Sequence, residues 1–419
     1  MPPSADRSGV HLLGQSGNQR MPGSGTSRRH TVSRHRIGRN QAVTPAAARP
    51  CGPLPFVHGF PQMIMKLSRR FVTTPHVLAL TAALLLAALK PAVADTFVLP
   101  TDGSTVVGKI RAVIATHKDT LSGIARRYDL GYREITQANP HVDPWLPGKG
   151  TRVVLPTRFI LPNVPYKGIV VDIGEMRLFY FPKPKPGQRA VVITHPIGIG
   201  RMNWETPIGT TQVIRKIPNP VWHVPPSIQA EHAKEGFPLP DIVPAGPNNP
   251  LGQFALQLGI PGYLIHGTNK PYGVGMRVSH GCMHLYPEDI AALFKEVPVG
   301  TQVRLINAPY LAGWSHGKIY LAAHLPLEEQ RKAWAGDMTP MVEAVMEAPH
   351  TAGTPIDWNK AIRVTKAALG IPIPISPNTP DTRAVIAAAP VIGAGPTGKQ
   401  AAPEAQKTPG PYLARNSAR

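Results

Sequence analysis

The sequence predicts a mainly β central domain that is preceded by a small α+β module and followed by a helical extension. Three observations lead to this fold class. Residues 166–307 contain several short runs of alternating apolar residues separated by turn signals, which is typical of half-buried strands. Residues 95–158 combine two short helical patterns with one strand pattern, and residues 308–370 carry longer helical patterns. A chain of 419 residues is long enough to hold these parts as separate domains.

The first 94 residues predict an export signal that follows a basic segment. Residues 1–62 carry eight arginines, one acid and little apolar periodicity, so we expect this segment to be disordered. Because an export signal follows it, we also expect that translation truly starts near residue 63 and that this segment results from a mis-called start. Residues 63–94 have the parts of a cleaved signal peptide, namely a basic start, an apolar run of 13 residues and a small-residue cleavage site that ends at Ala94. Because so short a run does not span a bilayer comfortably, we expect a periplasmic protein with no stable membrane span.

Export changes the meaning of the net charge and of the cysteine count. Of the formal net charge of +21, residues 1–62 and 63–94 contribute +7 and +4, which leaves about +10 on the mature chain. This mild excess suits an anionic cell wall, and we expect no nucleic-acid partner in the periplasm. Loss of Cys51 leaves Cys282 as the single cysteine of the mature chain, so no internal disulfide can form. In an oxidising compartment, a retained single thiol favours chemistry over scaffolding.

The module over residues 95–158 is predicted from short periodic segments. Asp119-Thr120 is a helix start, and an apolar stripe follows it at helical spacing as far as Tyr128. A second helix is expected over residues 132–138, where Asn139-Pro140 ends it. Residues 152–155 predict a returning strand.

The central domain and the extension are predicted in the same way. Strands are expected over residues 169–173, 176–181, 189–195, 209–217 and 263–265. A helix is expected after Pro287. Residues 219–250 are rich in proline and form either a lid over a cleft or a structural insertion. In the extension we expect a strand over residues 317–323, helices over residues 327–348 and 358–369, and a flexible Pro/Ala-rich tail over residues 371–419.

Residues 265–290 carry the chemistry that the sequence predicts. This stretch contains Cys282 and three histidines. A thiol nucleophile needs a base and a pocket that stabilises negative charge. Gly281 allows a tight turn in which its own amide and the amide of Cys282 face a common oxygen atom. A neighbouring imidazole is expected to lower the pKa of the thiol and to favour the thiolate.

Two other interpretations of this stretch remain open. A buried cysteine is often a small hydrophobic residue of the core, and a lone histidine is often a hydrogen-bonded polar residue. A zinc site is the second alternative, and its four candidate ligands are His266, His280, Cys282 and His284. Their spacing is not one of the usual paired-ligand spacings, and Gly281 favours a turn over the strand that would align them.

Two pieces of this stretch resemble the signature of a known family. His266-Gly-Thr-Asn269, a glycine-rich spacer and Ser279-His-Gly-Cys282 are similar to the motif of the L,D-transpeptidases (YkuD-type catalytic domain), in particular of their ErfK/YbiS-like branch. The similarity extends from about Gly168 to Asn307, and we place the catalytic domain at residues 166–307. The resemblance implies a YkuD-type β-sandwich with a short helix after the cysteine.

The resemblance also implies roles for individual residues. Cys282 would be the nucleophile and His266 its base, with the carbonyl group of Gly267 orienting the imidazole. The residues that would face the substrate and its oxyanion are Ser279, His280, Gly281, His284 and the amide of Cys282. No metal or organic cofactor is implied.

His284 departs from the family pattern. The family usually carries arginine two residues after the cysteine, or asparagine in one branch, whereas this chain has histidine. An arginine can hold a carboxylate through two parallel hydrogen bonds, and a histidine cannot. We therefore expect His284 either to contact the substrate in a pH-dependent way or to pack against Tyr286 and the following helix.

The function that this resemblance implies is cysteine acyl transfer on peptidoglycan. The thiolate would attack a tetrapeptide stem at the L-centre of diaminopimelate, and the terminal D-alanine would leave. The acceptor is either another stem, which gives a 3-3 cross-link, or a lysine of an outer-membrane protein or lipoprotein, which gives a tether. Two alternatives remain, namely hydrolysis, in which water accepts the acyl group, and a non-catalytic protein that binds peptidoglycan.

A second resemblance concerns the module. Asp119-Thr-Leu-Ser-Gly-Ile-Ala-Arg-Arg-Tyr128, followed by Ile135-Thr-Gln-Ala-Asn-Pro140, resembles a LysM domain. This resemblance implies that the module binds glycan containing N-acetylglucosamine. Lys118 departs from the common pattern, because glycine usually precedes the aspartate. The alternative is a helical hairpin that serves as a spacer without affinity for sugar.

Overall fold

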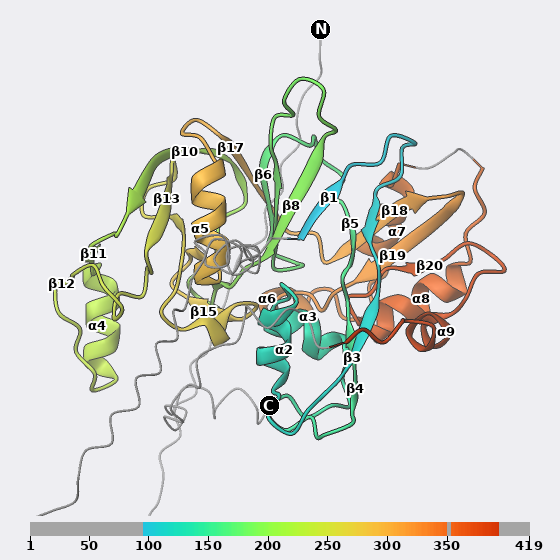
Figure 1. Cartoon of the computed structure of the whole chain (residues 1–419), viewed down its shortest axis with the longest axis horizontal. Coiled ribbons are helices and arrows are strands. Elements are labelled where there is room, and N and C mark those ends of the chain that lie inside the picture. The colour runs from blue at the N-terminus through green and yellow to red at the C-terminus, as the bar shows by residue number, and fades with distance from the viewer. Residues whose placement is uncertain (1–94, 350–352, 394–419) are drawn as a thin grey trace, which may run out of the picture. The chain divides into compact units, whose positions relative to one another are not determined.

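A nine-stranded sheet carries the fold. The computed structural model describes residues 95–349 and 353–393, so the basic segment and the export signal expected before residue 95 lie outside the described residues. Along the sheet the strands follow the order β1-β8-β7-β6-β17-β10-β13-β14-β16 (Figure 1). They are β1 (Asp95–Val98), β6 (Gly168–Asp172), β7 (Arg177–Phe181), β8 (Val191–Pro196), β10 (Gly209–Pro218), β13 (Phe254–Leu258), β14 (Leu264–His266), β16 (Met283–His284) and β17 (Gln302–Ile306). The prediction of a mainly β central domain is confirmed.

Two pairings in this sheet are parallel. β17 pairs with β6, and β14 pairs with β16 through Ile265 and Met283. The other neighbours are antiparallel. β10 contacts β17 through its first half and β13 through its second half, with a shift of register between Val213 and Arg215. Such a bulge bends a strand and increases its twist, so β10 connects the two halves of a curled sheet.

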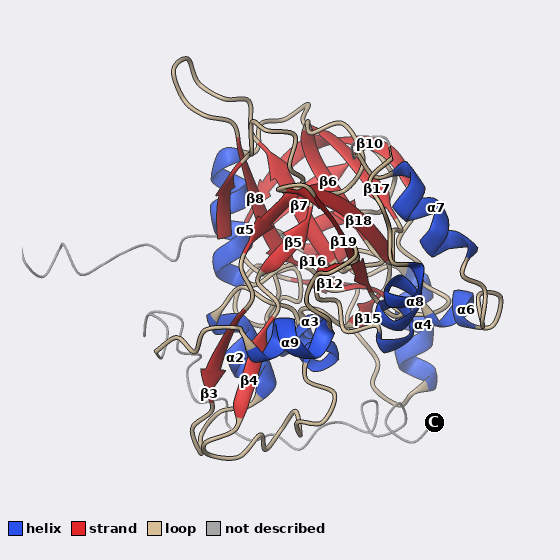
Figure 2. Cartoon of the chain, turned by 90° about the vertical axis from the view of Figure 1, so that its right-hand side faces the viewer, coloured by secondary structure: helices blue, strands red, loops and turns tan. Residues whose placement is uncertain are grey.

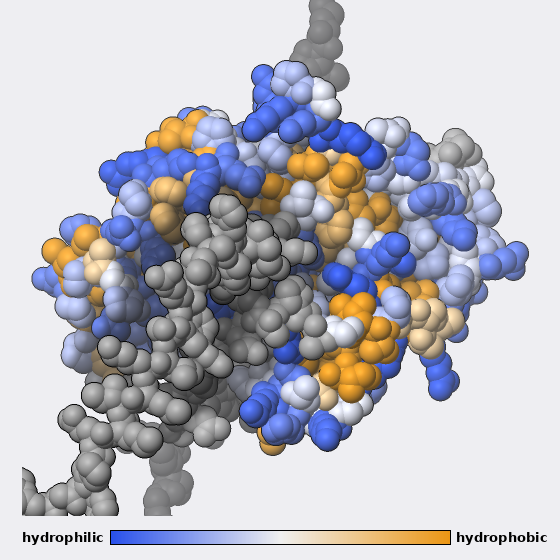
Figure 3. All heavy atoms as spheres, in the orientation of Figure 1, coloured by the Kyte–Doolittle hydropathy of each residue, from blue (hydrophilic) through white to orange (hydrophobic). Residues whose placement is uncertain are grey.

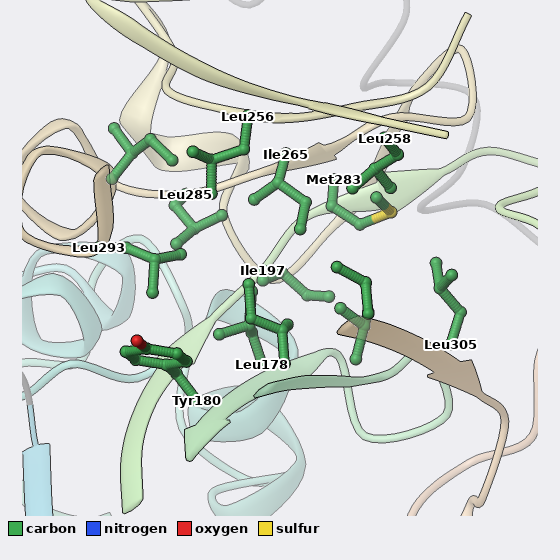
Figure 4. Packing of buried hydrophobic residues seen from close by; sticks show 14 of the residues in the cluster. Leu178, Tyr180, Ile197, Leu256, Leu258, Ile265, Met283, Leu285, Leu293 and Leu305 are labelled. Atoms are coloured by element: carbon green, nitrogen blue, oxygen red, sulfur yellow. The ribbon is translucent and has the colours of Figure 1, made fainter. Parts of the chain in front are cut away.

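The main hydrophobic cluster anchors β14 and β16. Figure 4 shows Ile265 of β14, Met283 of β16 and Leu293 of α5 (Pro287–Glu296) among its members. Ile265 and Met283 are fully buried, and burial of one such side chain contributes about 1.5–3 kcal/mol. This packing fixes two neighbours in the sequence, His266 after Ile265 and Cys282 before Met283.

The small α+β module is present, with one change in its bounds. Its elements are β2 (Val106–Gly108), β3 (Arg111–Ile114), α2 (Leu121–Arg127), α3 (Tyr132–Ala138), β4 (Arg152–Leu155) and β5 (Arg158–Ile160). The predicted bounds of the second helix and of the returning strand are confirmed. Thr120 caps α2, since its Oγ1 accepts a hydrogen bond from the amide of Gly123 at 3.0 Å. The predicted start of the module at residue 95 is wrong, because residues 95–98 form β1 and pair with β8 of the main sheet.

A buried network of charges joins the module to the main sheet. Arg177 of β7 has no exposed surface, and its Nε and Nη2 donate to the two carboxylate oxygens of Glu134 in α3 at 2.7 and 2.9 Å. Nη2 also donates to the carbonyl of Asp129 at 2.8 Å, and Nη1 donates to Thr194 Oγ1 at 3.1 Å. Although burial opposes it, the charge of Glu134 holds the pKa of Arg177 above its ordinary value. The module is therefore fixed to the central domain through an ion pair.

Further contacts tie the module to the stretch that contains the motif. Arg126 of α2 donates two hydrogen bonds to the carboxylate of Glu288 in α5, both at 3.0 Å. The hydroxyl of Tyr286 donates to the carbonyl of Leu130 at 3.0 Å. The amide of Tyr132 donates to the carbonyl of Val274 at 3.0 Å, within the glycine-rich spacer of the motif. The module therefore contacts the glycine-rich spacer, which follows the first half of the motif, and α5, which follows the second half.

The extension contains a second small sheet with helices beside it. Its elements are β18 (Tyr310–Ser315), β19 (Lys318–Ala323), α6 (Glu328–Arg331), α7 (Thr339–Glu347), α8 (Trp358–Ala367), β20 (Ile373–Pro374) and α9 (Thr382–Ala387). Figure 2 shows α7 and α8 next to the β18–β19 strands. One prediction is corrected here. The helix expected over residues 327–348 is two helices, because the chain turns at Gly336, which has a positive φ of 80°.

The flexible tail predicted from residue 371 is wrong for residues 371–393. Ile371, Ile373 and Ile375 are buried, and β20 pairs with β19. Further on, Arg152 of β4 donates to the carbonyls of Ile386 and Ala389 at 2.9 and 2.8 Å. The proline-rich composition concealed an alternation of isoleucines that is typical of a strand.

His324, at the end of β19, gives a prediction about stability and pH. Its ring is buried, and both ring nitrogens are without a hydrogen-bond partner among the described residues. Burial, with Arg133 and Arg177 nearby, lowers the pKa of His324 from 6.5 to about 3. Below pH 6.5 the unfolded chain therefore binds a proton at this residue that the folded chain does not bind, so this residue's contribution to stability falls as the pH falls toward 3.

His324→Leu is expected to remove this dependence. As the pH is lowered from about 6 to about 4.5, the free energy of unfolding of the variant, relative to that of the wild type, should rise by about 1.4 kcal/mol for each pH unit. Urea unfolding at a series of pH values measures the difference, in which the titration of all other groups cancels. A difference that does not change with pH would contradict a neutral, buried His324.

Candidate active site

Cys282 lies in the turn that leads into β16. Its side chain is half-buried, and Sγ donates to the carbonyl of Gly262 at 3.6 Å. Ser279 closes the turn, since its Oγ donates to the carbonyl of Cys282 at 2.6 Å. Gly281 has a φ of 102°, and the ring of Tyr263 occupies the space that a side chain would need. The turn is therefore rigid and holds the thiol at the edge of the core.

His266 ends β14, on the strand that neighbours β16. Its Nδ1 lies 2.5 Å from the carbonyl oxygen of Gly267, the group that the family resemblance assigns to orienting the ring. A carbonyl oxygen only accepts, so Nδ1 carries the proton and Nε2 is the basic nitrogen. Burial, with His284 nearby, lowers the pKa of His266 to about 3. The imidazole is therefore neutral at pH 7 and can accept a proton.

The thiol is neutral as well. Burial raises the pKa of Cys282 to about 11, although the amide of Leu264 opposes this shift. The lowered pKa expected from the sequence is opposed by burial, which favours the neutral thiol. Sγ is engaged by the carbonyl of Gly262.

His284 is packed inside the protein. Its side chain is 5% exposed, and Nε2 donates to the carbonyl of Gly273 at 3.1 Å. Its ring centroid is 6.2 Å from that of His266. Burial lowers the pKa of His284 to about 4. Of the two roles expected from the sequence, these contacts favour packing, and the partners are Gly273 and the backbone at Gly198.

Gly198→Ala is expected to disturb this packing. A Cβ at residue 198 would overlap the ring of His284, and the two residues exchange backbone hydrogen bonds at 2.8 and 3.0 Å. Because β16 has to shift, we expect the free energy of unfolding to fall by about 1–3 kcal/mol and turnover to fall with it. Urea unfolding and a turnover assay measure the two effects. Gly393→Ala, where a Cβ meets open space, is the matched control, and equal stability of the two variants would contradict the packing role.

His280 contacts the segment that the sequence left as a lid or an insertion. Its Nε2 lies 2.9 Å from Oε2 of Glu231 in α4 (Pro226–Lys234) and 2.9 Å from Nη2 of Arg201. The ring of Trp204 packs against it in a T-shaped arrangement, at a centroid distance of 4.8 Å. His280 therefore links the cysteine turn to residues 219–250.

Three residues near the turn were not assigned from the sequence. Thr206 Oγ1 donates to the carbonyl of Gly281 at 2.9 Å and accepts from the amide of Gly200 at 3.0 Å. These two hydrogen bonds tie the cysteine turn to Gly200. Thr206 lies within the region that resembles the family, but the resemblance assigned no role to this residue. Arg201 and Glu231 form a salt bridge, and no local pattern predicted that they would meet.

The four candidate zinc ligands contact different partners. The contacts already described join Cys282 to Gly262, His266 to Gly267, His280 to Glu231 and His284 to Gly273. In the described part of the chain, the group of three side chains with the spacing for a metal ion is Asp129, His195 and Asp289, where the module meets α5. The geometry thus does not bring the motif's side chains to one point.

Comparison with known proteins identifies the domain. Residues 166–305 match the family model of the L,D-transpeptidase catalytic domain (YkuD). The chain is also 40% identical over 285 residues to the probable L,D-transpeptidase YbiS of Escherichia coli K12, an alignment that covers 67% of this chain and 92% of that protein. The chain belongs to the L,D-transpeptidase family. It is an L,D-transpeptidase of the ErfK/YbiS-like branch, which confirms the resemblance seen in the motif.

Another curated relative agrees with this L,D-transpeptidase assignment. The chain is 38% identical over 297 residues to the probable L,D-transpeptidase ErfK/SrfK of Salmonella typhimurium, covering 68% of this chain and 93% of that protein. Structural alignment with an L,D-transpeptidase from Mycobacterium smegmatis covers 36% of this chain and 61% of that chain, with 22% identity and a TM-score of 0.25. Within residues 95–349 and 353–393, the helices are all too short or too polar to cross a membrane.

Proposed function

We propose that this L,D-transpeptidase acts in the periplasm on the stem peptides of peptidoglycan, with Cys282 as nucleophile and His266 as base. The observation that supports this proposal most directly is the parallel pairing of β14 with β16, in which His266 and His284 are register partners and Cys282 comes directly before β16. The export signal expected over residues 63–94 supports the location. The named relatives support the reaction type.

In the first half of the reaction, the thiol loses its proton to Nε2 of His266 as Sγ bonds to the carbonyl carbon at the L-centre of diaminopimelate. The amides of Gly281 and Cys282 stabilise the negative charge on the carbonyl oxygen. The bond to the terminal D-alanine then breaks, and His266 returns the proton to the leaving amine. The product of this half-reaction is a thioester on Cys282.

In the second half, an amine attacks the thioester carbon. The amine gives a proton to His266, the carbon–sulfur bond breaks, and the thiol of Cys282 is restored with that proton. A second stem as acceptor gives a 3-3 cross-link, and a lysine of an outer-membrane protein gives a tether. For the module we propose binding of the glycan strand, which would bring the stems to a domain that is fixed beside it through Arg177 and Glu134.

Analysis of the products tests the proposed function. The purified chain is incubated with disaccharide tetrapeptides, with and without a lysine-containing peptide from an outer-membrane protein, and the products are identified by mass spectrometry. We expect free D-alanine together with cross-linked dimers or a peptide adduct. Tripeptides with free D-alanine and no other product would indicate a hydrolase. Unchanged tetrapeptides, with glycan binding retained, would indicate a non-catalytic binding protein.

A further inference from the structure

Residues 219–250, which we call the flap, close on themselves beside the cysteine turn. Two short strands of the flap, β11 (Trp222–His223) and β12 (Ile242–Val243), pair with each other, and α4 lies between them in the sequence (Figure 1). The side chain of Asn249 is fully buried at the base of the flap. Its Nδ2 donates to the carbonyls of Pro220, Val243 and Pro244. The base of the flap is therefore fixed.

Away from its base, the flap is lightly packed. Ile228 is the buried residue of α4, and the hydrophobic clusters of the described residues include no side chain from this helix. Phe237 and Ile242 are 65% and 50% exposed. Figure 3 shows apolar side chains at the left edge of the molecule, where β12 lies. A segment with so few buried contacts can move at low cost in free energy.

A carboxylate holds α4 against the cysteine turn. Oε1 of Glu231 contacts Nη2 of Arg201, and Oε2 lies 2.9 Å from Nε2 of His280. The amide of Arg201 donates to the carbonyl of Ser279 at 3.0 Å, so the arginine belongs to the turn and not to the flap. His280 comes two residues before Cys282. Two groups of the active site thus share one carboxylate from the flap.

His280 cannot satisfy both of its neighbours with one nitrogen. Arginine only donates, so its contact with Nε2 at 2.9 Å requires a lone pair there, whereas a hydrogen bond to Glu231 requires a proton on the same atom. Burial lowers the pKa of His280 below its ordinary value, which keeps the ring singly protonated at neutral pH. Arg201 therefore provides most of the attraction for the carboxylate.

This carboxylate is accessible and weakly held. The side chains of Arg201, Glu231 and His280 are 17%, 28% and 21% exposed. Although burial opposes it, the hydrogen bond and the positive charge of Arg201 hold the pKa of Glu231 below its ordinary value, so the group is ionised. A solvent-exposed ion pair favours the closed form by a factor of at most about five. Another carboxylate can therefore displace Glu231.

We propose that Arg201 and His280 form a subsite for a carboxylate of the donor peptide, and that Glu231 occupies this subsite until the donor displaces it. This inference rests on the proposed function, because the donor stem supplies the carboxylate. His284 is buried and donates to the backbone, so it offers no such contact. Two carboxylates of the donor have the required chemistry, the terminal one of D-alanine and the one at the D-centre of diaminopimelate. The flap opens when either takes the place of Glu231.

Steady-state kinetics of two flap variants test whether Glu231 competes with the donor for the subsite. Glu231→Gln removes the competing charge, so KM for the tetrapeptide is expected to fall by between about two- and fivefold while kcat stays within about twofold of the wild type. Asp241→Asn is the matched control, since it removes a carboxylate of the same flap that bonds to Gln229 and not to the active-site turn. A KM for Glu231→Gln that is unchanged or raised would overturn the proposal that Glu231 competes with the donor. A fall in KM of equal size for Asp241→Asn would overturn it as well.

A second experiment tests the subsite with amidated donors. Arg201→Gln is expected to raise KM for the tetrapeptide by about ten- to a hundredfold, and Arg201→Lys by less, because lysine keeps the charge without the planar fork. Each variant is then assayed with a donor amidated at D-alanine and with a donor amidated at diaminopimelate. The carboxylate whose amidation removes the difference between wild type and Arg201→Gln is the one that binds.

A difference that persists with both amidated donors would overturn the subsite, and so would equal KM values for wild type and Arg201→Gln with the unmodified donor. These outcomes differ from a failure of the proposed function. In that case the wild-type chain releases no D-alanine from any of the three donors.

Discussion

Cys282→Ala is expected to abolish the release of D-alanine from tetrapeptide stems, with a loss of at least about a thousandfold in kcat. The methyl group cannot form the thioester, and the remaining groups of the site have no other nucleophile to orient. The fold should survive, because the turn is held by the hydroxyls of Ser279 and Thr206 and not by the thiol. A coupled assay for free D-alanine measures the loss, and urea unfolding serves as the control for stability. Turnover equal to that of the wild type would rule out Cys282 as the nucleophile.

Arg177→Met is expected to lower the free energy of unfolding by about 3–5 kcal/mol. The substitution leaves the carboxylate of Glu134 buried without its cation, at a position where the arginine also satisfies Asp129 and Thr194. The double variant Arg177→Met/Glu134→Leu should lose less than the sum of the two single variants, since no buried charge remains alone. Urea unfolding of the four proteins measures this coupling.

An ion pair inside the module provides the comparison for Arg177. Nη2 of Arg127 lies 2.7 Å from Oδ1 of Asp119, and the two side chains are 22% and 12% exposed. Arg127→Met should therefore cost only about 0–1 kcal/mol. If Arg177→Met costs no more than Arg127→Met, the junction between the module and the main sheet does not depend on the buried pair.

The sequence predicts the parts of the fold that depend on neighbours along the chain. The helix over residues 132–138 and the strand over residues 152–155 are found at the expected residues, because capping, periodicity and a proline stop act locally. The active-site motif is recognisable for a similar reason, since Gly281 has to adopt a φ that favours glycine. Residues 166–305 match the family model of the catalytic domain.

Other features depend on residues that are distant in the sequence, and no local pattern predicts them. Arg177 and Glu134 are 43 residues apart, and Glu231 and His280 are 49 apart. The protonation state of Cys282 depends on how the folded chain buries the thiol, and no local pattern predicts that burial. The order of residues 371–393 was missed because their proline content is typical of a tail, whereas the isoleucines pack into the sheet of the extension.

Intact-protein mass spectrometry tests the role of Cys282 most directly. The purified chain is mixed with a tetrapeptide donor in the absence of an acceptor amine, and the reaction is stopped with acid after short times. We expect the chain to gain the mass of the donor less that of D-alanine, the added group to map to Cys282 after proteolysis, and the adduct to disappear when an acceptor amine is added. Release of D-alanine without an adduct on Cys282, or an adduct of the same mass on Cys282→Ala, would contradict the proposed mechanism.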